Sequence, residues 1–196
     1  MLELPVATIR NWEERYAAVV PERSAGGQRL YSREQVDQLR FVASQLERGL
    51  SAADAHRLLS DRAPGPPADE PSDRTGPLVL IVERDPVAAE LTQSVLRSEG
   101  YATELVFAAS VAEAIWLERR PQLAIVELMI SGGQGADLCR RLEQRGGGAV
   151  LASSTLDARD EAIAAGADAF LRKPVDPVEL VSTVGDLVGT GSRGDA

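Results

Sequence analysis

The sequence predicts an α/β fold, in which a five-stranded, doubly wound parallel sheet follows a small, mainly helical segment. Beyond residue 77, short apolar runs alternate with stretches that carry helix-start signals. That alternation is typical of parallel strands joined by helices that cover both faces of a sheet. Before residue 63, helix signals flank a single irregular stretch that contains the turn Gly26-Gly27. The two halves therefore differ in class.

A proline-rich stretch separates these halves. Residues 63–77 hold five of the eleven prolines and no large apolar side chain. Such a segment cannot bury a core and is expected to be a semi-extended linker. We therefore predict a first domain over 1–62, a linker over 63–77, a second domain over 78–188 and a disordered tail over 189–196.

Apolar runs and cap signals place the elements of the second domain. Its strands are predicted over 78–82, 104–108, 123–126, 149–153 and 169–171. Three helices have start signals, at Asp85-Pro86, at the capping box Ser110-Val-Ala-Glu113 and at Asp176-Pro-Val-Glu179. The first of these should end near Ser98 and the last near Leu187. Two more helices are expected over 136–144 and 158–165.

The first domain has the signals of three helices. One helix starts at Pro5 and runs to about Arg15. The capping box Ser32-Arg-Glu-Gln35 starts a second that ends at Arg48. Gly49 stops that helix, and Ser51 starts a short one to about Leu59.

Composition excludes several classes of site. The chain has a net charge of −9, but residues 1–62 hold nine arginines and nine acids. Only this part could offer a positive face to DNA. The single cysteine, Cys139, and the single histidine, His56, exclude an internal disulfide and an ordinary zinc site. We expect no metal and no cofactor. Without a membrane-length apolar run or a signal peptide, we expect a cytoplasmic protein with no membrane partner.

Polar side chains follow the predicted strands of the second domain, where the carboxyl ends of parallel strands meet. Ligand and reaction sites of such sheets lie at this edge. The residues there form a candidate ionic cluster: Glu83, Arg84 and Asp85 after the first strand, Glu127 after the third, Ser154 at the end of the fourth and Lys173, the only lysine, after the fifth.

Four strings in this domain resemble the response-regulator receiver domain over about residues 78–188. They are Val79-Leu-Ile-Val-Glu-Arg-Asp-Pro86, Pro121-Gln-Leu-Ala-Ile-Val-Glu-Leu-Met-Ile130, Ala165-Gly-Ala-Asp168 and Phe170-Leu-Arg-Lys-Pro174. The resemblance implies a flavodoxin-like fold and a two-component system. It also implies a phospho-accepting aspartate where this chain has Glu127, two metal-binding acids where it has Glu83 and Arg84, and switch positions at Ser154 and Phe170.

The departures from that family predict an atypical, phosphorylation-independent pseudo-receiver. Arginine in place of a carboxylate removes a ligand and repels Mg²⁺, so phosphoryl transfer would lack its main stabiliser. We expect Lys173 to pair with Glu127, and Arg84 to grip Glu127 bidentately in place of the cation. Lys173 could instead be a structural counter-charge without a signalling role, and Asp85 an N-cap. A phospho-receiver that uses a neighbouring acid and a small ligand in place of the phosphate are the alternatives.

In the first domain, arginines and aromatic residues alternate before and after the glycine turn. This pattern suits a helix in the major groove and a loop over phosphates, although a solvated arginine face is the plainer alternative. The ordered strings Leu4-Pro-Val-Ala-Thr-Ile-Arg-Asn-Trp-Glu13 and Gly27-Gln-Arg-Leu-Tyr-Ser32 resemble a MerR-type winged helix-turn-helix DNA-binding domain over about residues 2–59. The candidate DNA-binding residues are Thr8, Arg10, Trp12 and Arg15 on the recognition helix, Arg23 after it, and Arg29 and Tyr31 in the wing.

That resemblance also sets expectations about assembly. Such domains begin with a further helix, which we expect to be missing here, and the family's long dimerising helix is replaced by the linker. Because dimers read paired half-sites, we expect a homodimer through the receiver surface 158–165, 169–171 and 177–187. The sequence thus predicts a DNA-binding transcription regulator with no catalytic residues. The alternative is a protein-interaction adaptor that no longer binds DNA and recruits a regulatory protein.

Overall fold

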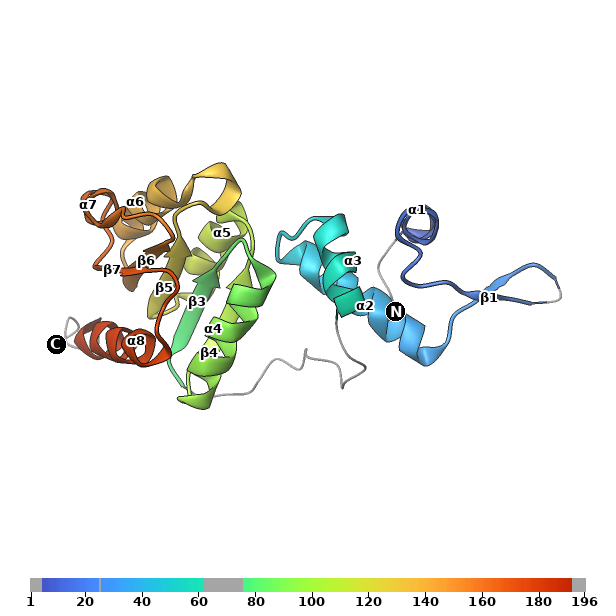
Figure 1. Cartoon of the computed structure of the whole chain (residues 1–196), viewed down its shortest axis with the longest axis horizontal. Coiled ribbons are helices and arrows are strands. Elements are labelled where there is room, and N and C mark those ends of the chain that lie inside the picture. The colour runs from blue at the N-terminus through green and yellow to red at the C-terminus, as the bar shows by residue number, and fades with distance from the viewer. Residues whose placement is uncertain (1–4, 25, 62–75, 192–196) are drawn as a thin grey trace. The chain divides into compact units, whose positions relative to one another are not determined.

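The computed structural model describes residues 5–24, 26–61 and 76–191. The chain divides into two compact units, Met1–Pro71 and Ser72–Ala196 (Figure 1). Residues 63–75 of the predicted linker and 192–196 of the predicted tail lie outside the described residues. No helix within the described ranges is both long enough and apolar enough to span a bilayer.

The second unit contains the predicted five-stranded parallel sheet, with strand order β4-β3-β5-β6-β7. The strands are β3 Leu78–Val82, β4 Ala102–Val106, β5 Leu123–Glu127, β6 Ala149–Ser154 and β7 Ala169–Arg172. β5 lies in the centre and is buried along its whole length, as a continuous apolar run predicts. The fold class is confirmed. The second strand begins and ends two residues earlier than predicted.

Helices cover the sheet on both faces (Figure 1). α4 and α8 pack together in one layer, and α5, α6 and α7 form the other. A buried core of residues such as Leu80, Val126 and Leu138 fills the space beneath the second layer. The helices are α4 Pro86–Ser98, α5 Ala109–Arg119, α6 Gly135–Arg145, α7 Arg159–Ala164 and α8 Pro177–Gly191, with a short 3₁₀ turn η1 at Ile130–Gly132.

Two of the three predicted helix starts in this unit are confirmed. The side chains of Asp85 and Asp176 each accept hydrogen bonds from two backbone N–H groups of the following turn. The predicted capping box at Ser110 is wrong, because α5 begins at Ala109 and Ser110 lies inside it. Instead, the first N–H of α5, at Ala109, donates to the hydroxyl of Ser131 from a distant loop. The last helix also continues to Gly191, into the predicted tail.

The first unit is mainly helical, as predicted. It consists of α1 Val6–Tyr16, an antiparallel pair of short strands β1 Glu22–Arg23 and β2 Arg29–Leu30, α2 Arg33–Glu47 and α3 Ala52–Asp61. The capping box of Ser32 and Gln35 is confirmed by both of its reciprocal hydrogen bonds. The two strands flank a turn in which Gly27 has φ +77°. An L side chain rarely adopts that conformation, so glycine suits this position.

Candidate functional sites

The carboxyl ends of β3, β5 and β7 bring Glu83, Glu127 and Lys173 to one edge of the sheet. Val82 is paired in register with Val126, so the two glutamates follow neighbouring strands side by side. Glu127 is itself in register with Ser153 of β6. The backbone N–H of Lys173 donates to the carbonyl of Ser154, which ties the residue after β7 to the end of β6. The topology therefore places both acids and the lysine together, as the sequence predicts.

Glu83 is the partner of Lys173. The ammonium of Lys173 donates to Oε2 of Glu83, and both side chains are largely buried. The other oxygen, Oε1, accepts hydrogen bonds from the backbone N–H groups of Arg84 and Asp85, at 2.9 and 3.2 Å. Both oxygens of Glu83 thus have protein partners. The prediction that Lys173 pairs with Glu127 is wrong, because the loop after β3 holds the Glu83 carboxylate ready to receive the ammonium.

Glu127 is the more poorly satisfied acid. Its side chain is 3% exposed, and its Oε2 is buried without a hydrogen-bond partner. The Nε atom of Arg84 lies 3.7 Å from that oxygen, but the guanidinium is 60% exposed to solvent. Burial raises the pKa of Glu127, and this effect exceeds the opposing influence of the Met129 backbone N–H and of Lys173. The predicted bidentate grip by Arg84 is therefore replaced by one long, solvent-screened contact.

The other three residues of the predicted cluster have structural partners. Asp85 caps α4. Ser154 is buried, and its hydroxyl accepts a hydrogen bond from the N–H of Leu156 at 3.1 Å. Phe170 is 3% exposed and packs in the core, with the guanidinium of Arg159 5.7 Å from its ring centroid. Both switch positions are thus held inside the unit.

The magnesium ion that the receiver fold implies does not fit these residues. Glu83 has no oxygen left without a partner, and Arg84 places a cation where a second carboxylate would be needed. Among the described residues, no group of three or more His, Cys, Asp or Glu side chains could hold a metal. Burial also raises the pKa of the Cys139 thiol to about 12, so it is no thiolate at neutral pH.

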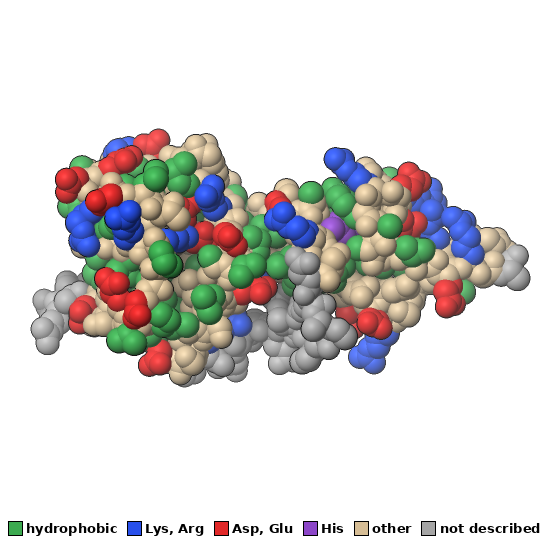
Figure 2. Space-filling model, in the orientation of Figure 1, with side chains coloured by type: hydrophobic (Ala, Val, Ile, Leu, Met, Phe, Trp, Pro, Cys, Tyr) green, Lys and Arg blue, Asp and Glu red, His purple; other side chains and the backbone are tan. Residues whose placement is uncertain are grey.

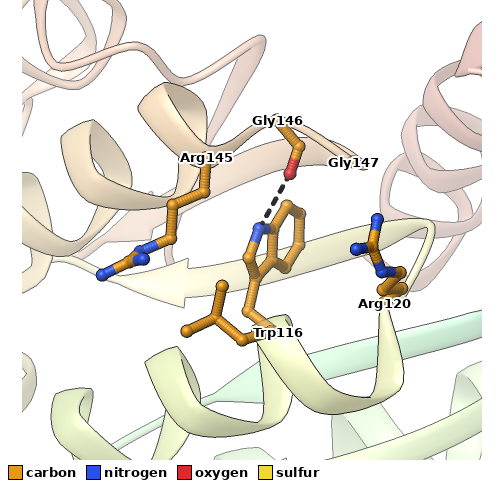
Figure 3. A pocket seen from close by; sticks show the side chains of 6 residues that line it. Trp116, Arg120, Arg145, Gly146 and Gly147 are labelled. Atoms are coloured by element: carbon orange, nitrogen blue, oxygen red, sulfur yellow. Dashed lines mark hydrogen bonds between the residues drawn. The ribbon is translucent and has the colours of Figure 1, made fainter.

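A small pocket lies at the opposite edge of the sheet. It has a cavity volume of about 60 Å³ and is lined in part by the buried Trp116 (Figure 3). The indole N–H of Trp116 donates to the carbonyl of Gly146 at 3.0 Å. Its walls include Arg120 and Arg145. These residues precede β5 and β6 in the sequence, so the pocket lies at the amino ends of the strands and is separate from the acidic cluster.

In the first unit, the surface of α1 and β1 carries exposed arginines beside the exposed acids Glu14 and Glu22. Arg10, Arg15 and Arg23 are exposed, and Thr8 is half-buried. Figure 2 shows basic side chains on the visible face over these elements. Trp12, by contrast, is only 6% exposed and belongs to the core. The prediction that its side chain contacts DNA is therefore wrong. The resemblance to the MerR-type domain placed Trp12 among the DNA-binding residues, whereas the structure buries its side chain.

Glu13 is a residue of this surface that the sequence analysis did not single out. Its Oε2 accepts a hydrogen bond from Nε of Arg29 at 2.8 Å, and its Oε1 accepts one from the hydroxyl of Tyr31. Burial and the contact with Glu13 raise the pKa of Tyr31 to about 12. Although burial raises the pKa of Glu13, its two hydrogen-bond donors outweigh burial and lower it. Arg29 and Tyr31 therefore fasten β2 to α1, across 16 and 18 residues of sequence.

Two protein-family models match this chain. The response regulator receiver domain matches residues 79–185, and the MerR HTH family regulatory protein matches residues 1–62. The chain is 37% identical over 109 residues to the DNA-binding response regulator MtrA of Mycolicibacterium smegmatis, which covers 54% of this chain and 48% of that protein. It is 33% identical over 114 residues to the phosphate regulon transcriptional regulatory protein PhoB of Rhizobium meliloti, covering 55% and 50%. The chain thus spans about half the length of the curated relatives it matches.

Solved structures agree on the fold. A CheY-like response regulator receiver domain protein from Methanospirillum hungatei superposes with a TM-score of 0.57 at 23% identity, over 61% of this chain and 98% of that chain. The receiver domain of the Francisella response regulator 1452 gives a TM-score of 0.56 at 24% identity, over 59% and 98%. The chain therefore belongs to the response regulator receiver family over residues 79–185, and it carries a MerR-type helix-turn-helix region over residues 1–62.

Proposed function

We propose that this chain is a DNA-binding transcription regulator whose receiver domain works without phosphorylation. The observation that carries the proposal is the ion pair of Glu83 and Lys173 beside the buried Glu127. In the family these positions serve metal binding and phosphoryl transfer. Here, protein charges occupy them. The receiver then serves to dimerise the chain or to receive a partner, and the chain is no enzyme.

The acceptor position supports a fixed receiver state. The carboxylate of Glu127 is one methylene longer than that of aspartate and reaches toward the place of an aspartyl phosphate. Arg84 supplies a cation near it, and Ser154 and Phe170 are both buried. We infer that the domain stays in one conformation that resembles the phosphorylated form.

The first unit supports DNA binding. Its exposed arginines lie on α1 and on the β1–β2 hairpin, and arginines of this kind contact phosphates and base edges. Glu13 holds the hairpin against the end of α1 through Arg29 and Tyr31. This link gives the helix and the wing a fixed mutual position, which a DNA-binding surface needs.

A protein-interaction adaptor is the second candidate. The observation in its favour is also the Glu13 link, because it occupies the charge of Arg29 and the hydroxyl of Tyr31, which the family would direct to the DNA backbone. The adaptor would dimerise or recruit a regulatory protein through the surface of α7, β7 and α8. For both candidate functions we propose that the protein is cytoplasmic.

DNA binding separates the two candidates. The full chain is titrated onto pooled genomic fragments by fluorescence anisotropy across a salt series. The regulator predicts saturable binding whose log K falls with log salt. The double variant Arg10→Ala, Arg15→Ala should lose about tenfold or more in affinity and lower the salt slope by about 1–2.

The matched control is Arg40→Ala with Arg57→Ala. It removes the same charge from exposed arginines that pair within α2 and α3, with Asp37 and Asp54. The control should bind DNA as the parent chain does. No binding by the parent at low salt would favour the adaptor. An equal loss in both double variants would show that the affinity depends on net charge and not on the surface of α1.

A further inference from the structure

The only histidine of the chain, His56, is buried at the centre of the first unit. It lies on α3 and is 3% exposed. Neither ring nitrogen has a hydrogen-bond partner. Buried polar side-chain atoms are rarely left without a partner, so this ring calls for an explanation.

Two aromatic rings of α1 contact His56. Its imidazole stacks on the ring of Tyr16, with 4.4 Å between centroids and 20° between planes. The ring of Trp12 meets it edge-on, at 5.2 Å and 77°. Trp12 and Tyr16 are four residues apart and so lie on one face of α1. His56 of α3 therefore contacts two consecutive turns of α1, the helix that carries Arg10 and Arg15, and fixes its position. We call this contact the seating of α1.

The surroundings of this ring favour its neutral form. Burial lowers the pKa of His56. The guanidinium of Arg15 lies 5.7 Å from the centroid of the Tyr16 ring and adds positive charge on that side. Three acids of the helices packed together here pair with other groups: Glu13 of α1 with Arg29 and Tyr31, Asp37 of α2 with Arg40, and Asp54 of α3 with Arg57. Glu14 of α1 and Glu34 and Glu47 of α2 are exposed to solvent.

We infer that His56 is a positioning residue for the DNA-reading helix α1, and that it seats this helix between Trp12 and Tyr16 only as an uncharged imidazole. Mild acid then releases α1 from α3, while the receiver unit keeps its fold. The evidence that His56 holds α1 in place is the geometry of its ring contacts. The expected effect on DNA affinity rests on the proposed function.

The direction of the pH effect follows from linkage. Above the ordinary histidine pKa of about 6.5, the ring is neutral whether α1 is seated or released, and pH has no effect. Below that value the released form binds a proton and the seated form does not. Each further pH unit should lower the seating equilibrium by up to about tenfold, until the seated ring also titrates.

The first test is an NMR titration of the full chain from pH 8 to pH 4.5. Because there is one histidine, its imidazole signals are assigned without ambiguity. We expect its midpoint to lie below about 6.5 and the Trp12 indole signal to move in parallel, with the Trp116 signal unchanged. A midpoint at or above about 6.5, or a Trp12 signal that does not follow it, would overturn the inference.

The second test compares His56→Phe with the parent chain. Phenylalanine keeps a planar ring between Trp12 and Tyr16 but cannot take a proton, so the Trp12 signal should become independent of pH. Arg57→Ala, one residue away and exposed, is the control and should keep the parent's pH response. If His56→Phe does not fold, the titration of the parent chain still decides.

DNA binding supplies a separate readout. The parent's affinity should fall by up to about fivefold between pH 6.5 and pH 5.5, and that of His56→Phe should not change. DNA binding that is absent at every pH, together with the expected NMR titration, would refute the proposed function and leave the seating of α1 intact. DNA binding of equal pH dependence in both chains would refute the positioning role.

Discussion

Two buried ionisable side chains, Glu83 in the second unit and His56 in the first, are accommodated in opposite ways. At the receiver edge, Glu83 is buried with a partner on each oxygen, two backbone N–H groups on one and Lys173 on the other. In the first unit, His56 is equally buried with no polar partner at all, and aromatic rings hold it. One site is therefore stabilised by charge and the other by the absence of charge.

The two side chains should respond differently to a change of charge. Removing one partner of a fully paired buried charge leaves the other charge uncompensated. A buried imidazole without polar partners becomes a buried, unpaired charge when it binds one proton, and its burial then costs free energy. The receiver edge should thus behave as a rigid part of the fold, and the contact between α1 and α3 as the adjustable one.

Lys173→Ala gives the largest expected effect. Glu83 would remain buried with a negative charge and without its cation, and breaking a buried pair in this way costs about 3–5 kcal/mol of unfolding free energy. The measurement is urea unfolding followed by far-UV circular dichroism. Arg172→Ala, at the exposed end of β7, serves as the control. A loss below about 1 kcal/mol would mean that the receiver edge does not depend on this pair.

Glu13→Gln tests the link between α1 and the hairpin. The variant weakens the contacts of Arg29 and Tyr31 and should cost about 1–2 kcal/mol, since both groups are partly exposed. The pKa of Tyr31, raised to about 12, should fall toward 10.0 in an absorbance titration. Because the pKa of Glu13 is lowered, its stabilisation is present above about pH 4.5 and is lost as pH falls further. An unchanged Tyr31 titration would contradict the link.

Glu127→Gln should stabilise the receiver unit slightly. Burial raises the pKa of Glu127, so its folded form prefers the proton and the charged form at neutral pH is destabilising. The amide avoids that cost at pH 7. The gain should disappear near pH 4, where the parent's carboxyl is protonated in both states. A destabilised variant at pH 7 would show instead that the Arg84 contact dominates.

Arg84→Ala should give the smallest effect. The contact with Glu127 is 3.7 Å long and the guanidinium is 60% exposed, so water screens it. We expect a change within about 0.5 kcal/mol in the same urea experiment. A loss comparable to that of Lys173→Ala would make Arg84 a true replacement for the missing cation.

The fold follows from the sequence because its signals are local. Leu78–Val82 is a continuous apolar run, and the structure has β3 over the same five residues. The capping-box prediction at Ser110 failed because the group that receives the first N–H of α5 is Ser131, which belongs to another loop. A local pattern cannot report a partner from a distant segment.

The candidate site could be predicted only to the level of the sheet edge. Parallel topology requires Glu83, Glu127 and Lys173 to meet, but it does not say which glutamate receives the ammonium. That choice depends on the backbone N–H groups that orient Glu83. The face on which Trp12 lies and the burial of His56 likewise depend on packing between α1 and α3, which helical spacing does not determine.

Whether this receiver works without phosphorylation is tested by the response of the full chain to Mg²⁺ with beryllofluoride. The NMR signals of the residues beside Glu127 are followed in a titration, with the double variant Glu127→Asp, Arg84→Asp as the positive control. We expect no saturable change in the parent chain and a Mg²⁺-dependent change in the double variant. A saturable, Mg²⁺-dependent shift in the parent would show that the phosphoryl site still works.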